Sequence, residues 1–145
     1  MDFFDAMAVS SSAMTAERTR MNLISGNLAN AGTTRTQEGG PYKRKDAVFS
    51  AVPVERSFSD TMKRLNSTPP GGVEISRVIE DTSPPRLQYD PTHPDADAQG
   101  YVAMPNVNFV EEMADMITAS RAYEANITAA QASKSMALKT LELGR

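Results

Sequence analysis

Apolar residues recur with helical spacing from Asn106 to Leu143. Pro105 precedes this segment and Gly144 follows it, which is typical of the two ends of a helix. The pattern therefore predicts a long C-terminal helix of about 57 Å, at 1.5 Å per residue. Steps of four and three residues select mostly apolar or small side chains, the a/d seam of a coiled coil: Phe109, Met113, Met116, Ser120, Tyr123, Ile127, Ala130, Lys134, Ala137 and Leu141.

The same stepping is present at the start of the chain, where residues 2–31 are predicted to form a second amphipathic helix. Gly26 weakens this helix, because glycine inside a helix costs about 1 kcal/mol relative to alanine. Since short helices gain most of their stability from packing, we expect the two terminal helices to pack against each other or against neighbouring molecules. The N-terminal seam contains Phe3, Met7, Ser10, Met14, Glu17, Met21, Ile24, Leu28 and Ala31.

The middle of the chain has a different composition. All nine prolines lie between Pro41 and Pro105. Alternating patterns predict strands at 42–52, with a bulge or slip, at 73–81 and at 86–90, separated by loops that include 32–41 and 66–72. We therefore expect an α+β protein with three parts: an N-terminal helix and its ending (1–35), a small β-rich insert domain (36–104) and a C-terminal helix (105–145).

Composition narrows the function classes. The chain has 145 residues and lacks Trp, so a large globular core is not expected. A net charge of -3 argues against nucleic-acid binding, and the one basic run, residues 41–45, is interpreted as a solvated strand edge. Cys is absent, which excludes disulfides and thiolate metal sites. Because neither a secretory signal pattern nor an apolar stretch of membrane-spanning length is present, we expect no cleaved signal peptide and no membrane insertion.

The single histidine lies in a segment rich in aspartate. Asp90, His93, Asp95 and Asp97 offer the nitrogen and oxygen ligands of a metal site on one loop. The rival interpretation is a proline-rich turn whose aspartates cap backbone N–H groups, and it is favoured because one histidine makes a weak transition-metal site. The sequence also lacks a nucleophile elbow and phosphate-binding glycine motifs. We therefore expect no metal, no cofactor and no enzymatic activity.

The residues alone thus indicate an assembly or interaction protein. Methionine-rich helical faces on a chain with a small core favour binding to partners. The alternative within this class is an adaptor or chaperone-like helical binding module, which would form a soluble stoichiometric complex and no polymer.

Three motifs connect the chain to a known family. The segments NLANAGTTRT (27–36) and GGPYKRK (39–45), together with residues 78–127, resemble bacterial flagellar basal-body rod and hook proteins. The resemblance covers nearly the whole chain and is closest to the proximal-rod members of that family. Residue by residue, the helix-ending motif and the C-terminal motif match at Asn27, Ala29, Asn30, Asn106, Glu111, Glu112, Met113, Arg121, Tyr123, Ala125 and Asn126.

This resemblance implies a structural subunit of the proximal rod, a hollow shaft that transmits torque and passes export substrates. It implies terminal helices packed into the rod core and an insert that contacts neighbours. The implied partners are copies of the chain, other rod proteins, MS-ring or rod-base components, the distal rod and the flagellar type III export apparatus. The implied location is the basal body, where the rod spans the periplasm, reached without a cleaved signal peptide.

Overall fold

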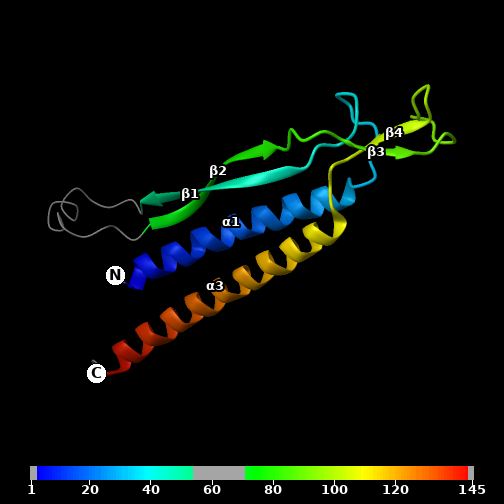
Figure 1. Ribbon diagram of the computed structural model, residues 1–145. Coiled ribbons are helices and arrows are strands. Elements are labelled where there is room, and N and C mark those ends of the chain that lie inside the picture. Colours follow the sequence, from blue (N-terminus) through cyan, green and yellow to red (C-terminus); the bar gives the residue numbers. More distant parts are fainter. Residues whose placement is uncertain (1–2, 54–70, 144–145) are drawn as a thin grey trace.

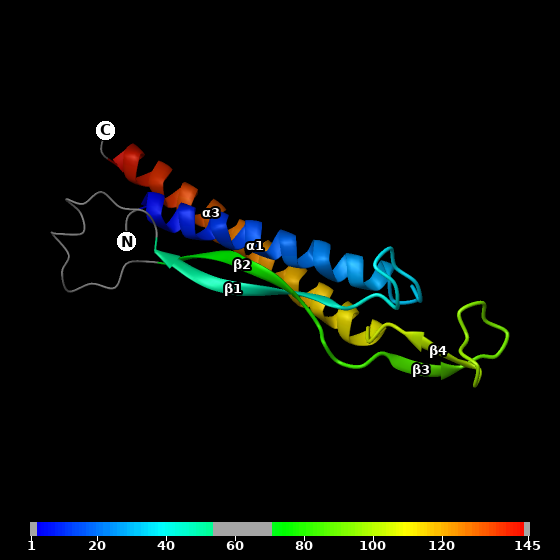
Figure 2. The same cartoon turned by 90° about the horizontal axis from the view of Figure 1, so that it is seen from above.

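The computed structural model describes residues 3–53 and 71–143. Two long helices, one near each end of the chain, flank two small antiparallel sheets in the sequence, so the predicted α+β class is confirmed. Figures 1 and 2 show an elongated molecule, and in Figure 1 α1 lies between the β1–β2 ribbon and α3. The elements are α1 (Phe3–Ala29), β1 (Lys45–Pro53), β2 (Gly71–Glu80), β3 (Arg86–Tyr89), β4 (Tyr101–Met104) and α3 (Phe109–Leu143).

The two helices run antiparallel, with the last turns of α1 beside the first turns of α3 (Figure 1). Among the described elements α3 packs against α1 alone, and Ala119 is fully buried in this contact. Within residues 3–53 and 71–143 the apolar core is small, as expected from the composition: its buried members there are Ala16, Ile24, Val102 and Ala119.

Helix α3 begins later than its predicted start at Asn106. The side-chain oxygen of Asn108 accepts a hydrogen bond from the Val110 N–H at 3.2 Å, so Asn108 is the N-cap. Glu111 and Glu112 follow in the first turn, where negative charge is favourable to the helix dipole. The N-terminal helix agrees with its prediction within two residues at its C-terminal end, since α1 ends at Ala29.

Strands β1 and β2 form an antiparallel ribbon with a β-bulge. Val48 pairs with Arg77 and Phe49 with Ile75, so Ser76 is the extra residue on β2. The hydroxyl of Ser76 donates to the Val48 carbonyl at 3.1 Å, which stabilises the irregular point. The sequence predicted a bulge or slip within 42–52; the register does shift there, between Val48 and Phe49, but the extra residue belongs to β2.

The ribbon is fixed to α1 by a close contact between Ser12 and the start of β2. The Ser12 hydroxyl accepts a hydrogen bond from the Val73 N–H at 3.1 Å and donates one to the Val9 carbonyl at 2.8 Å. Gly72 permits this approach, because a Cβ at that position would lie 3.1 Å from the Ser12 hydroxyl oxygen. The predicted loop at 66–72 is thus wrong for Gly71 and Gly72, which begin β2, and residues 66–70 lie outside the described ranges.

Strand β3 matches its prediction, whereas β4 was not predicted. Tyr89 pairs with Tyr101, and their rings meet edge to face with centroids 5.3 Å apart. Gly100 closes the intervening loop with φ of 81°, and a Cβ there would lie 2.9 Å from the Tyr89 ring. Val102 on β4 is 2% exposed, the one buried apolar residue of this second ribbon.

Candidate functional site

A buried group of polar side chains lies where the end of α1, the start of β1 and the start of α3 meet. We call Asn27, Tyr42, Arg44 and Glu112 the polar junction. Asn27 and Glu112 are each only 1% exposed. Buried polar groups are costly unless they are hydrogen-bonded, so their partners determine what the junction does.

The Asn27 amide uses its full hydrogen-bonding capacity in the junction. Its nitrogen donates to the Lys45 carbonyl at 2.9 Å and to a Glu112 carboxylate oxygen at 3.0 Å. Its oxygen accepts from the Lys45 N–H at 2.9 Å and from the Tyr42 hydroxyl at 3.0 Å. One side chain thereby joins α1, the chain entering β1, and α3.

Glu112 is neutralised by Arg44, whose guanidinium Nε donates to the carboxylate. Burial lowers the pKa of Arg44, but hydrogen bonding and attraction to Glu112, helped by Asp46, outweigh it and raise the pKa overall. Arg44 also lies 3.7 Å from Asp115, which in turn lies 3.7 Å from Arg20 on α1. The ion pairs therefore link both helices to the start of β1.

Tyr42 stays a neutral donor in this environment. Burial raises the pKa of its hydroxyl; Lys45 opposes that shift and Glu112 adds to it. The backbone of Tyr42 is placed by a turn after α1, because its N–H donates to the Thr33 carbonyl at 3.0 Å. Asn30 shapes the same turn: its amide donates to the Gly26 carbonyl at 2.9 Å and accepts from the Thr33 hydroxyl at 3.2 Å.

The residues of the predicted helix-ending motif thus separate into different environments. Asn27 is buried in the junction, Asn30 caps the end of α1, and Ala29 is exposed. In the C-terminal motif, Asn106 accepts the Arg44 N–H at 3.4 Å, whereas Glu111 and Arg121 are exposed.

The interpretation of residues 41–45 as a solvated basic edge is wrong for Arg44. The side chain of Arg44 is 22% exposed and contacts Glu112, which is buried on α3. Sequence reasoning missed Tyr42 and Arg44 as junction residues, because the composition of the run gives no sign of a carboxylate that is distant in the sequence. The only signal was the position of both residues inside the GGPYKRK motif.

The predicted seam of α3 is partly turned away from α1. Phe109, Met113 and Leu141 are 56%, 46% and 71% exposed. The stripe that is buried or half-buried coincides with the predicted seam at every second position and lies one residue earlier at the positions between, where small or polar side chains allow α1 to approach. Its members are Glu112, Met116, Ala119, Tyr123, Asn126, Ala130, Ser133 and Ala137. Ile127 and Ser120 are also half-buried, and Lys134 is exposed.

On α1, Met14, Met21 and Leu28 of the predicted seam are half-buried, while Met7 is 39% exposed. The methionine spacing therefore follows the packed side of α1 except near its N-terminal end.

The loop around His93 uses its polar side chains as turn caps. Asp90 accepts hydrogen bonds from the Thr92 N–H and hydroxyl, and Asp97 accepts from two backbone N–H groups. The Nδ1 atom of His93 accepts the Asp95 N–H at 3.1 Å. Within residues 3–53 and 71–143, no three His, Asp or Glu residues are grouped so as to hold a metal ion. The geometry is that of the capped turn.

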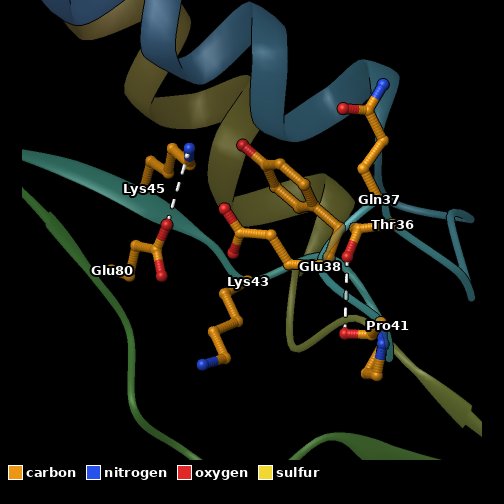
Figure 3. Close-up of a pocket in the computed structure, with 9 residues that line it drawn as sticks. Thr36, Gln37, Glu38, Pro41, Lys43, Lys45 and Glu80 are labelled. Atoms are coloured by element: carbon orange, nitrogen blue, oxygen red, sulfur yellow. Dashed lines mark hydrogen bonds and ion pairs between the residues drawn. The ribbon is translucent and has the colours of Figure 1, made fainter.

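A shallow pocket of about 310 Å³ lies beside the turn before β1 (Figure 3). Its charged lining is mixed, with Lys43, Lys45, Glu38 and Glu80, and the Lys45 and Glu80 side chains form an ion pair at 3.5 Å. Because these charges offset one another, the pocket favours neither an anion nor a cation. The junction and the helix faces remain the stronger candidates for function.

Comparisons with known proteins decide the family. The family model for the flagella basal body rod protein matches residues 7–36, and that for the flagellar basal body rod FlgEFG protein C-terminal matches residues 98–143. The flagellar basal-body rod protein FlgC of Bacillus subtilis is 45% identical, with 100% of both chains covered. The chain belongs to the FlgC family. FlgC of Borreliella burgdorferi is 44% identical over 94% of this chain and 93% of its own, and FlgC of Salmonella typhimurium is 41% identical over 100% and 98%.

Membership of the FlgC family confirms the resemblance seen in the motifs. FlgC proteins are structural rod proteins and not a family of enzymes, so this chain is a structural subunit of the flagellar basal-body rod. Of the helices in the described ranges, neither has the length and hydropathy needed to span a membrane.

Proposed function

We propose that this rod subunit assembles through its terminal helices, with copies of itself and with other rod proteins, into a hollow shaft that transmits torque. The main support is an apolar stripe on the outer side of α3. Phe109, Val110, Met113 and Ile117 are 56%, 75%, 46% and 53% exposed over three successive turns. Large contiguous apolar patches on a protein surface mark interaction sites, and this one follows a single helix face.

The polar junction has a complementary role in this proposal. It fixes the end of α1 against the start of α3 through Asn27, Arg44 and Glu112, so the outer stripe is presented on a rigid base. A contact between different surfaces of successive subunits continues without closing, which suits a rod. In this proposal the helices pack in a coiled-coil-like manner along the rod, and residues 36–104 form the outer part between the helical segments 1–35 and 105–145.

Further parts of the proposal follow from the family. The chain is exported unfolded by the flagellar type III apparatus without a cleaved signal peptide, and it joins rod-base and distal-rod components in the periplasm. Arg121 is exposed and has no ion pair within the described part of the chain. We assign it to a carboxylate of an adjacent subunit.

Substitutions on α3 test the assembly role of the helix. Met113→Asp on the outer stripe and Ile127→Asp on the half-buried side should each abolish incorporation into basal bodies, because an unpaired charge would be buried in an apolar contact. Thr118→Asp, at an exposed polar position of the same helix about 140° around its axis from Met113, is the matched control. The readouts are motility and the amount of the chain in purified basal bodies, with circular dichroism to verify folding.

Normal motility and normal rod yield in both apolar variants would overturn the helix-packing proposal. A soluble stoichiometric complex with one partner, without incorporation of the unmodified chain into rods, would instead favour the adaptor interpretation.

A further inference from the structure

A groove of about 690 Å³ runs between α1 and the start of β2. Its helical wall carries only small side chains, and its strand wall carries Val73, Glu74 and Ile75. The groove exists because Ser12 holds β2 close to α1 while the neighbouring small residues leave space beside the contact. The residues of the helical wall are Ala8, Ser11, Ser12, Thr15, Ala16 and Thr19.

The far end of α3 has the opposite character. Helix α1 ends and helix α3 begins at the junction, and they have 27 and 35 residues, so the C-terminal end of α3 extends about 12 Å beyond the start of α1. Every residue from 138 to 142 is exposed. Leu138 and Leu141, 52% and 71% exposed, lie on one face of this end together with Lys134.

The two surfaces complement each other in size and charge. The large leucine side chains at the end of α3 match in size the groove, whose wall on α1 carries small side chains. Lys134 has no ion pair in the described ranges, and Glu74 at the groove has only a long hydrogen bond of 3.5 Å from the Ser50 hydroxyl. The end of α3 cannot enter the groove of its own chain, because α1 lies between α3 and the ribbon (Figure 1).

We propose that the C-terminal end of α3 in one copy of this chain occupies the α1–β2 groove of the next copy, with Leu138 and Leu141 in the groove and Lys134 beside Glu74. The proposal rests on the proposed function and adds the location of a contact between copies. Groove and helix end are different surfaces, so the contact is heterologous and propagates from copy to copy. It also gives a role to Leu141, which belongs to the predicted a/d seam of α3 but is exposed in the single chain.

Cysteine cross-linking tests this contact directly, because the chain contains no cysteine of its own. Glu142→Cys lies next to Leu141 and leaves both leucines and Lys134 in place. It is combined with Ser11→Cys or with Thr15→Cys in the groove. The matched control combines it with Ser25→Cys, which is exposed on α1 about 15 Å further along the helix than Thr15 and about 21 Å further than Ser11. Each full-length variant replaces the resident protein of a motile host, and purified basal bodies are oxidised.

A groove pair should give dimers and higher oligomers at about ten times the yield of the control, because a disulfide requires Cα atoms within about 7 Å. Incorporation of the variants without any excess cross-linking of either groove pair would overturn the contact and leave the rod function intact. Absence of the unmodified chain from basal bodies would overturn the proposed function itself. The two failures are therefore distinguishable.

Charge reversal provides an independent measurement. Glu74→Lys should lower incorporation about threefold, the effect of one exposed ion pair, and the second change Lys134→Glu should restore it. If the double variant is no better than Glu74→Lys alone, these two residues do not meet and the proposed arrangement is wrong.

Discussion

Replacing Asn27 by aspartate probes the polar junction with almost no change in shape. The substitution exchanges the amide nitrogen for an oxygen and so removes two donated hydrogen bonds, to the Lys45 carbonyl and to Glu112. It also places a second carboxylate 3.0 Å from the first, where both side chains are 1% exposed. The perturbation is therefore electrostatic.

The expected destabilisation is large. Loss of the bond to the Lys45 carbonyl costs about 1 kcal/mol, and loss of the charged bond to Glu112 costs about 1.5–3 kcal/mol. Repulsion between the carboxylates adds a further amount, because one of them is forced to take up a proton and its pKa rises. We expect a total of about 4 kcal/mol at pH 7, a large part of the stability of a typical domain.

The sign of the pH dependence distinguishes this mechanism from a packing defect. A carboxyl whose pKa is raised by folding favours the native state below its unfolded pKa, about 4, and this contribution is lost as the pH rises through the folded value. The deficit of Asn27→Asp should therefore be smaller at pH 4.5 than at pH 7. Urea unfolding at both pH values measures it, with Asn22→Asp at an exposed position of α1 as the control. A deficit below about 1 kcal/mol at pH 7, or one independent of pH, would refute the reasoning.

Three further perturbations have defined outcomes. Arg44→Ala leaves buried Glu112 unpaired and should cost about 3 kcal/mol in urea unfolding, and adding Glu112→Gln should recover part of that loss; equal losses in the single and double variants would contradict this. Gly100→Ala should lower the thermal midpoint by several degrees, for a cost of about 1–2 kcal/mol, since its φ is 81° and the new Cβ meets the Tyr89 ring; an unchanged midpoint would contradict this. Hydrogen bonds from Thr92 lower the pKa of Asp90, so the associated stability is present above pH of about 4 and is lost on acidification. Thr92→Val should raise the Asp90 pKa in an NMR titration, and an unchanged pKa would show that the hydroxyl is unimportant.

The elements with a strong period could be predicted from the sequence. Residues 109–143 carry a helical pattern over many turns, and residues 73–80 alternate as a strand, so local preference and tertiary packing agree there. The sequence also indicated an irregularity within 42–52, and the register shifts there between Val48 and Phe49, although the extra residue is on β2. Strands β3 and β4 have four residues each, too few for a period to be recognised; β3 was expected from its place directly after Pro84 and Pro85, and β4 has no such signal before it.

Long-range contacts could not be predicted in the same way. The ion pair between Arg44 and Glu112 joins residues separated by 68 positions, and nothing local distinguishes Arg44 from the neighbouring lysines. The phase of the α3 seam was similarly undetermined, because the large apolar residues and the small ones form two adjacent stripes. Which stripe faces α1 depends on the surface it meets, and here the polar junction places Glu112 inside and Met113 outside.

Amide hydrogen exchange tests the central claim most directly, by comparing the purified chain with the same chain in isolated basal bodies. The account predicts that the distal half of α3, residues 120–142, is weakly protected in the free subunit and strongly protected in the basal body, since its outward positions gain partners only on assembly. The segments around Asn27 and Glu112 should be protected in both states. Equal protection of residues 120–142 in the free and assembled chain would contradict assembly through the terminal helices.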